Sequence, residues 1–141
     1  LGFDVALPTE VQWEKAARGT DGRIYPYGNT YDPAKRNTSD TGLERTSAVG
    51  LFPQGASPYR VLDMSGNVFD WCLTKWDWQY ADGVQEMDND PDGSDARVLR
   101  GGAWSSALNL ARCAFRFDDL SPSLWYNDIG VRVCCACVPH L

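Results

Sequence analysis

The chain has 141 residues and a formal net charge of −6, and 43% of its residues are hydrophobic. This length and composition predict one globular domain with a core of its own. An acidic chain lacks the basic face that nucleic-acid binding needs, and no apolar run approaches the roughly 20 residues that span a bilayer. We therefore expect no nucleic-acid partner and no membrane insertion. The sequence shows no signal-peptide pattern, so the compartment stays open, and it does not indicate the oligomeric state.

The segment 8–19, "PTEVQWEKAARG", predicts a helix. Thr9 is the expected N-cap, and Gln12, three residues later, completes a capping box. Glu14 and Arg18 have the spacing of an i,i+4 ion pair. Gly19 stands where a left-handed residue commonly ends a helix.

The remainder of the chain reads as loops and short strands. Residues 23–58 are rich in turn signals, and residues 82–95 form an acidic, turn-prone loop. "VFDWCLTKW" (68–76) and "RVLRGG" (97–102) are expected to be short strands, and "IGVRVCCACV" (129–138) is the best strand pattern. The prediction is a loop-rich α+β domain with a small sheet, spanning residues 1–141.

The cysteine and histidine content excludes several kinds of site. Five cysteines leave at least one thiol unpaired in a monomer: Cys72, Cys113, Cys134, Cys135 and Cys137. Buried reduced thiols are favoured over a disulfide from Cys72 or Cys113 to the tail, and over a zinc site, which needs four suitably spaced ligands. His140 is the only histidine and lies next to the chain end, so a hydrolytic triad is not expected. "DNDPDGSD" (88–95) offers oxygen ligands for calcium but lacks the EF-hand pattern, and a solvated turn is favoured.

Six motifs occur in the order seen in one known family. They are "LPTEVQWEKAARG", "YPYGN", "VGLFPQGASPYRVLDMSGNVFDW", "RVLRGGAW", "RCAFR" and "GVRV". Together they resemble the formylglycine-generating enzyme (sulfatase-modifying factor) family over about residues 6–133. The resemblance implies a C-type lectin fold of the formylglycine-generating-enzyme type, with a small antiparallel sheet, long loops and few helices.

Some residues of these six motifs, here called the frame, have structural roles that can be proposed from their chemistry. Glycines allow tight backbone geometry, tryptophans fill the core, and arginines pair with Asp63 or Asp70. The expected frame positions are Gly66, Gly101, Gly102, Trp13, Trp71, Trp104, Arg100, Arg112, Arg116 and Arg132.

The resemblance does not carry the family's chemistry with it. The family's oxidase binds copper through two cysteines that follow the Gly-Gly-Ser-aromatic turn. Ser106 occupies the first position here, the second has no cysteine, and Cys113 belongs to the "RCA" element. Serine is a poor ligand for Cu(I), and the histidine ligands of related iron-dependent sulfoxide synthases are absent. We therefore expect no enzyme activity.

The segment 105–128 resembles the variable region of a second group on this scaffold, the variable proteins of diversity-generating retroelements. Adenine-directed mutagenesis there rewrites Asn-type codons, which cannot reach Lys, Glu, Gln, Met or Trp. The segment contains none of the first four. The positions that fit such codons are Ser105, Ser106, Leu108, Asn109, Leu110, Phe115, Phe117, Asp118, Asp119, Leu120, Ser123, Leu124, Tyr126, Asn127 and Asp128. The expected fixed positions are Ala107, Ala111, Arg112, Cys113, Ala114, Arg116, Pro122 and Trp125.

The predicted function is binding of an unknown protein or surface ligand through residues 105–128. Aromatic residues among Ser, Asn and Asp resemble an antibody paratope. Three alternatives stay open: a copper oxidase of the formylglycine-generating type, active or degenerate; a structural accessory domain; and inward packing of the aromatic residues as core. The resemblance also implies a subsidiary calcium site near "GNVFDW", at Asn67, Val68 and Asp70, with no other cofactor expected.

Overall fold

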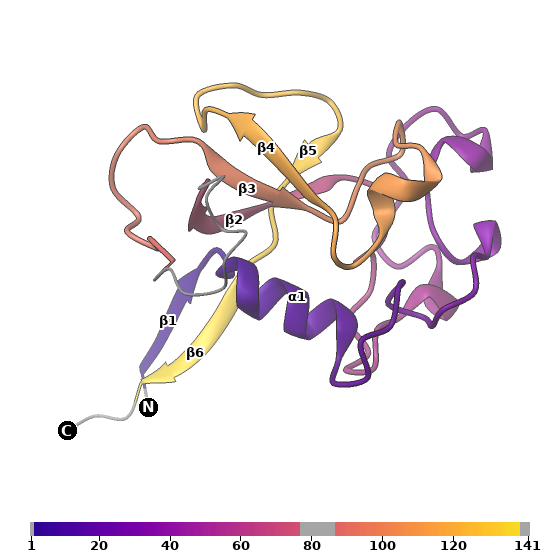
Figure 1. The fold of residues 1–141 in the computed structure, drawn as a ribbon, viewed down its shortest axis with the longest axis horizontal. Helices are drawn as coiled ribbons and strands as arrows, with labels where there is room; N and C mark the ends of the chain where they lie inside the picture. Colours follow the sequence, from indigo (N-terminus) through magenta and orange to yellow (C-terminus); the bar gives the residue numbers. More distant parts are fainter. Residues whose placement is uncertain (1, 77–86, 139–141) are drawn as a thin grey trace.

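The computed structural model describes residues 2–76 and 87–138 and has few helices and two small sheets (Figure 1). His140 lies outside these residues. The elements in chain order are β1 (Gly2–Ala6), α1 (Glu10–Arg18), the 3-10 turns η1 (Pro33–Lys35), η2 (Ser39–Thr41) and η3 (Pro53–Gly55), β2 (Phe69–Lys75), β3 (Arg97–Arg100), η5 (Leu108–Ala111), β4 (Arg116–Leu120), β5 (Ile129–Gly130) and β6 (Cys134–Val138). This content confirms the predicted α+β class. Among the described residues, no helix has the length and apolar character needed to cross a bilayer.

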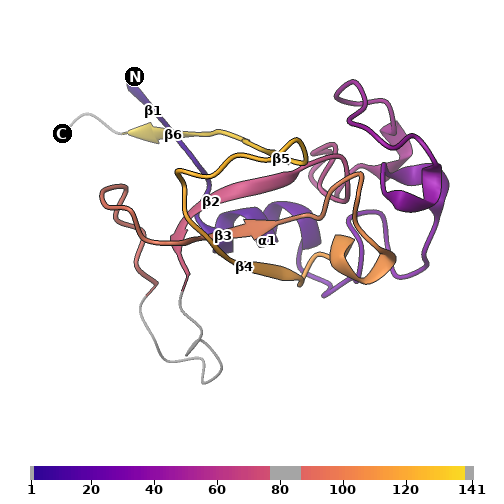
Figure 2. The same ribbon diagram turned by 90° about the horizontal axis from the view of Figure 1, so that it is seen from above.

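The larger sheet has the strand order β4-β3-β2-β5. β3 runs antiparallel to both β2 and β4, whereas β5 pairs parallel with β2, with Phe69 opposite Ile129. The second sheet is an antiparallel ribbon of β1 and β6 that carries both chain ends at the lower left of Figure 1. In Figure 2 the strands β5, β2, β3 and β4 follow one another across the view, and α1 lies behind β3.

The predicted strand at 129–138 is divided between the two sheets. β5 ends at Gly130 and β6 begins at Cys134. Between them Arg132 turns inward to Asp70, with Nε 3.0 Å from Oδ2, while Val131 and Val133 are exposed. The single-strand prediction was wrong because the continuous apolar run concealed this inward arginine. β1 and β4 were not predicted.

Helix α1 follows its capping signals at the N-terminus. Thr9 Oγ1 accepts the N–H of Gln12 at 3.3 Å, and the Gln12 side chain accepts the N–H of Thr9 at 2.9 Å, which completes the predicted capping box. At the other end Gly19 has φ 71° but ψ −136°, so it ends the helix outside the left-handed helical region expected for it. Its N–H still donates to the carbonyl of Lys15 at 3.0 Å.

The core has two parts on opposite faces of the larger sheet. Val98 packs in a cluster with Trp13, Ala17, Met64, Cys72 and Cys113 on the α1 side, whereas the next residue, Leu99, packs with Phe69 and Ala103. Adjacent strand residues point to opposite faces, so β3 supplies both clusters. The four cysteines whose side chains are described, Cys72, Cys113, Cys134 and Cys135, are free thiols.

The arginines pair differently from the expectation. Arg132 binds Asp70 as predicted, but Arg100 and Arg116 bind the helix carboxylates. Glu10 lies 3.1 Å from Arg100 and 2.6 Å from Arg116, and Glu14 lies 2.6 Å from Arg100. The prediction missed these pairs because the helix positions of the two glutamates gave no sign that they face the sheet.

Candidate functional site

Glycine turns hold the start of the predicted variable region in place. Gly66 has φ +86°, and a Cβ there would lie 2.1 Å from the carbonyl oxygen of Asn37. Its N–H donates to the carbonyl of Gly101 at 2.8 Å. Gly102 has φ +73°, and a Cβ there would lie 2.9 Å from Cα of Ala111 in η5. Only glycine, which has no Cβ, fits at these two positions, as the sequence predicted for Gly66 and Gly102.

The two ends of the segment 105–128 meet beside strands β2 and β5. Ser105 Oγ donates to Oδ2 of Asp128 at 2.7 Å. The Trp104 indole N–H donates to the carbonyl of Asn127 at 3.4 Å, and the N–H of Phe69 donates to the carbonyl of Asp128 at 2.8 Å. Residues that are 23 positions apart are therefore fixed together at the edge of the sheet.

The loop 121–128 carries the exposed side chains. Trp125 is 86% exposed, and its neighbours Leu124 and Tyr126 are about half exposed. A turn closed by the Leu124 N–H and the Ser121 carbonyl, 2.9 Å apart, supports the loop. In Figure 1 this loop forms the upper edge of the molecule between β4 and β5, and η5 lies farther to the right. The predicted variable residues exposed on the loop and on the segment around η5 are Ser105, Leu108, Asn109, Ser123, Leu124, Tyr126 and Asn127.

Ser106 does not belong to this surface. It is only 3% exposed, and its Oγ accepts the N–H of Ala103 at 2.9 Å. Its carbonyl accepts the N–H of Ser39 at 3.2 Å and the Ser39 hydroxyl at 2.9 Å. The prediction that Ser106 contacts ligand was wrong, because its codon type carried no information on burial.

Other predicted variable positions are partly or wholly removed from the surface. Phe115 and Phe117 are half-buried against the second core cluster, and the rings of Phe117 and Phe69 are 5.1 Å apart. Leu110 and Asp128 are half-buried as well. Asp118, Asp119 and Leu120 lie on β4, where only the backbone is described. Inward packing, the alternative left open above, therefore holds for the two phenylalanines and not for Tyr126.

Trp125 is the residue that the sequence reasoning missed. The sequence predicts Trp125 to be a fixed position, because the expected codon changes cannot produce tryptophan. In the described structure it is the most exposed of the large hydrophobic residues. Its position between Leu124 and Tyr126, after the turn-forming "SPS", was the signal available in the sequence.

The two core cysteines do not fit a copper site of the family's type. Cys72 and Cys113 are fully buried, and burial raises the pKa of each thiol to about 12. Both thiols lie in the core cluster with Trp13 and Val98, so neither is accessible to a metal ion from the solvent. Ser106, at the first cysteine position, is occupied by its bond to Ala103. Within residues 2–76 and 87–138 there is no group of three or more His, Cys, Asp or Glu side chains that is arranged to hold a metal ion.

The predicted calcium residues do not fit a calcium ion either. Asn67 Oδ1 accepts the Ser47 N–H at 2.8 Å. Asp70 Oδ2 accepts the Trp13 indole N–H at 2.9 Å and binds Arg132. Burial raises the pKa of Asp70, although Arg132 and Trp13 oppose the shift. Of the calcium site predicted at Asn67, Val68 and Asp70, these two side-chain oxygens are engaged by N–H donors, one of them cationic, and do not fit as calcium ligands.

The acidic loop 88–95 binds protein cations in a similar way. Arg97 Nη2 donates to the carbonyl oxygens of Asp90 and Pro91, both at 2.9 Å. Lys75 Nζ lies 3.0 Å from Asp88 and 3.1 Å from Asp95. The bonds to these two carboxylates raise the pKa of Lys75. A guanidinium and an ammonium thus occupy positions that a bound cation would take.

Comparison with known proteins places the chain in a family. Residues 4–137 match the model of the sulfatase-modifying factor enzyme 1-like domain. The chain is 32% identical over 142 residues to the inactive C-alpha-formylglycine-generating enzyme 2 of Mus musculus, covering 89% of this chain and 41% of that protein. It is 34% identical over 132 residues to the formylglycine-generating enzyme of Thermomonospora curvata, covering 78% and 43%. The chain therefore spans less than half of either relative.

A solved structure agrees with this assignment. Treponema denticola variable protein 1 superposes with a TM-score of 0.78 and 28% sequence identity, over 92% of this chain and 46% of that one. The predicted resemblance to both the formylglycine-generating enzymes and the variable proteins is confirmed, as is the predicted fold type. The chain belongs to the family of sulfatase-modifying factor enzyme 1-like domains.

Proposed function

We propose that this domain is a non-catalytic ligand-binding protein whose recognition surface is built on the loop 121–128 and the segment around η5. The observation that carries the proposal is the outward position of Trp125, flanked by Leu124 and Tyr126, on a loop held at its base. Exposed aromatic groups of this size are typical anchors of protein interfaces. The recognition surface is defined as Ser105, Leu108, Asn109, Ser123, Leu124, Trp125, Tyr126 and Asn127.

The backbone contacts at the base of the loop 121–128 would allow its exposed side chains to be replaced without loss of the fold. The bonds that fix the loop base use backbone groups of Asn127 and Asp128, and one side-chain pair joins Ser105 to Asp128. Exposed side chains such as Leu124 and Tyr126 contribute little to the core, so their replacement costs little stability. A rigid base with replaceable side chains is the arrangement of a preorganised paratope.

The residues at the family's copper position also favour binding over oxidation. Ser106 replaces a cysteine, and the thiols of Cys72 and Cys113 are enclosed in the core. The mouse relative is named inactive, and the Treponema relative is named a variable protein. The similar identity to the Thermomonospora enzyme keeps copper oxidation as the second candidate. We expect neither Cu(I) binding nor oxidation of a cysteine peptide, and detection of both activities would replace the proposed function with the enzymatic one.

The source genome gives the first test of the proposal. We expect a nearby reverse-transcriptase gene and an imperfect repeat of the codons for 105–128 that differs at adenines. Absence of both the gene and the repeat would overturn the proposal that this surface is diversified.

A display library gives a second test with a matched control. Randomising Leu108, Ser123, Leu124 and Tyr126 should leave most variants folded and should yield binders to unrelated proteins. Randomising the same number of buried positions, with Ser106 and Leu99 among them, should abolish folding in most variants. Equal folding in both libraries, or no binder from the first, would contradict the proposal.

A further inference from the structure

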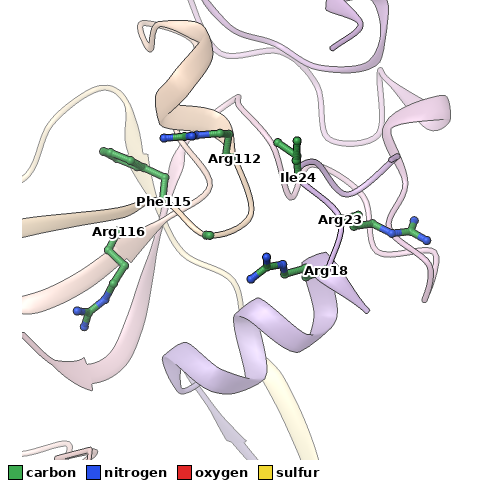
Figure 3. Close-up of a pocket in the computed structure, with 7 residues that line it drawn as sticks. Arg18, Arg23, Ile24, Arg112, Phe115 and Arg116 are labelled. Carbon is green, nitrogen blue, oxygen red and sulfur yellow. The ribbon is translucent and has the colours of Figure 1, made fainter. Parts of the chain in front are cut away.

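A pocket of about 490 Å³ lies between the C-terminal end of α1 and the segment 112–116. Four arginines line it, Arg18, Arg23, Arg112 and Arg116, and Ile24 and Phe115 supply apolar walls. Figure 3 shows Arg18 reaching from the helix end toward the segment 112–116, with Arg23 turned away. This volume is within the roughly 300–1,000 Å³ range of small-ligand sites. Four arginines in the lining of one pocket are unexpected in a chain with a net charge of −6.

Three of the four arginines form ion pairs with carboxylates of the protein. Arg18 lies 2.8 Å from Glu14. The remaining two pairs, each 2.6 Å apart, are Arg23 with Asp21 and Arg116 with Glu10. Each of these three side chains is therefore held by a carboxylate, although Glu10 and Glu14 are shared with Arg100.

Arg112 is different. Its Nε donates to the carbonyl of Asn109 at 2.9 Å, which fixes the side chain against the end of η5. In the described part of the chain, no carboxylate forms an ion pair with it and its two terminal nitrogens have no hydrogen-bond partner. Arg112 is exposed, and in Figure 3 its guanidinium lies on the side of the pocket where Phe115 is drawn. The pocket thus presents one oriented pair of unoccupied N–H donors beside an apolar wall.

We propose that this pocket binds a carboxylate carried on an aromatic or aliphatic body. The two terminal nitrogens of Arg112 match the two oxygens of a carboxylate, and Ile24 and Phe115 contact the apolar body. A monoanion fits because Arg112 is the one lining arginine that has no carboxylate partner within residues 2–76 and 87–138. No side chain of the recognition surface lines this pocket, and the bond that joins Arg112 to that surface goes to the backbone carbonyl of Asn109.

The test is an NMR titration of the ¹⁵N-labelled chain with phenylacetate at constant ionic strength. We expect saturable shifts at the amides of residues 22–24 and 112–116, and much weaker shifts with 2-phenylethanol, which has the same body without charge. Arg112→Gln should weaken phenylacetate binding at least about tenfold, because a charge-assisted bond is lost. Arg45→Gln removes the same charge at an exposed residue that does not line the pocket and should leave binding unchanged.

The source of the carboxylate is distinguished by a second pair of probes. N-acetyl-Gly-Phe with a free carboxylate, compared with its amide, reports on a peptide C-terminus. Tighter binding of this peptide acid than of phenylacetate assigns the site to a chain end, and the reverse order assigns it to a free acid. The proposal is overturned if no probe gives saturable shifts at these amides, or if Arg112→Gln binds phenylacetate as well as the unchanged protein does.

Discussion

Glu10 connects helix α1 to two strands, and its replacement by glutamine gives the strongest test of the described core. Its carboxylate accepts bonds from Arg116 Nε at 2.6 Å and Nη2 at 2.8 Å, and lies 3.1 Å from Arg100 Nη1. Glu10 is 3% exposed and Arg100 is fully buried. Removing one partner of a buried ion pair costs about 3–5 kcal/mol. Because Glu14 still binds Arg100, we expect the lower end, a loss of about 3 kcal/mol in the free energy of unfolding.

The loss is measured by urea denaturation followed by tryptophan fluorescence. For a chain of this size it corresponds to a decrease of about 10 °C in Tm. Glu44→Gln is the matched control, because Glu44 is exposed and forms no ion pair in the described structure. It should change the free energy of unfolding by no more than about 0.5 kcal/mol. A Glu10→Gln variant as stable as this control would refute the assignment of Glu10 as a buried partner of both arginines.

Further predictions concern the surface, the frame, the thiols and metal binding. Trp125→Ser should change the free energy of unfolding by less than about 0.5 kcal/mol, because the ring is exposed, and a clearly larger loss in urea would place it in the core. Ser106→Ala should cost about 1–3 kcal/mol, because the Ala103 N–H loses its acceptor; an unchanged urea midpoint would contradict that role. Iodoacetamide at pH 9 should leave Cys72 and Cys113 unmodified in the folded chain, as mass spectrometry would report, because burial raises the pKa of both thiols to about 12. The same pKa shift predicts that the free energy of unfolding decreases as the pH rises from 9 toward 12, because unfolding releases thiol protons that the folded state retains. A chelator should leave Tm unchanged, and a fall in Tm restored by calcium would show that a site has been missed.

The sequence predicted those parts of the fold that depend on local signals. The capping box of Thr9 and Gln12 gave the start of α1, and Gly66 and Gly102 gave the tight turns. The break between β5 and β6 was missed because it depends on Arg132 reaching Asp70, which lies 62 positions away. Long-range pairs of this kind leave no periodic pattern in a single chain.

Burial explains why the candidate site was only partly predicted. Codon reach selected Ser106 as variable although its side chain is buried, and it excluded Trp125 although its ring is in solvent. Neither fact is visible without the positions of Ala103 and of the turn at Ser121. The pairing of Ser105 with Asp128 was also invisible, since 23 residues separate them. The type of each residue indicated which chemistry its side chain could supply, but the sequence did not show whether that side chain points to the core or to the solvent.

The closed base of the recognition loop has a consequence for loop length. The bond from the Phe69 N–H to the Asp128 carbonyl fixes one end, and β4 fixes the other through its pairing with β3. When both ends of a loop are already held, doubling its length adds only about 0.6 kcal/mol of closure entropy. Residues inserted between Ser121 and Asn127 would therefore enlarge the reach of the surface at little cost to folding. Length, as well as side-chain identity, is a property that this frame leaves free to change.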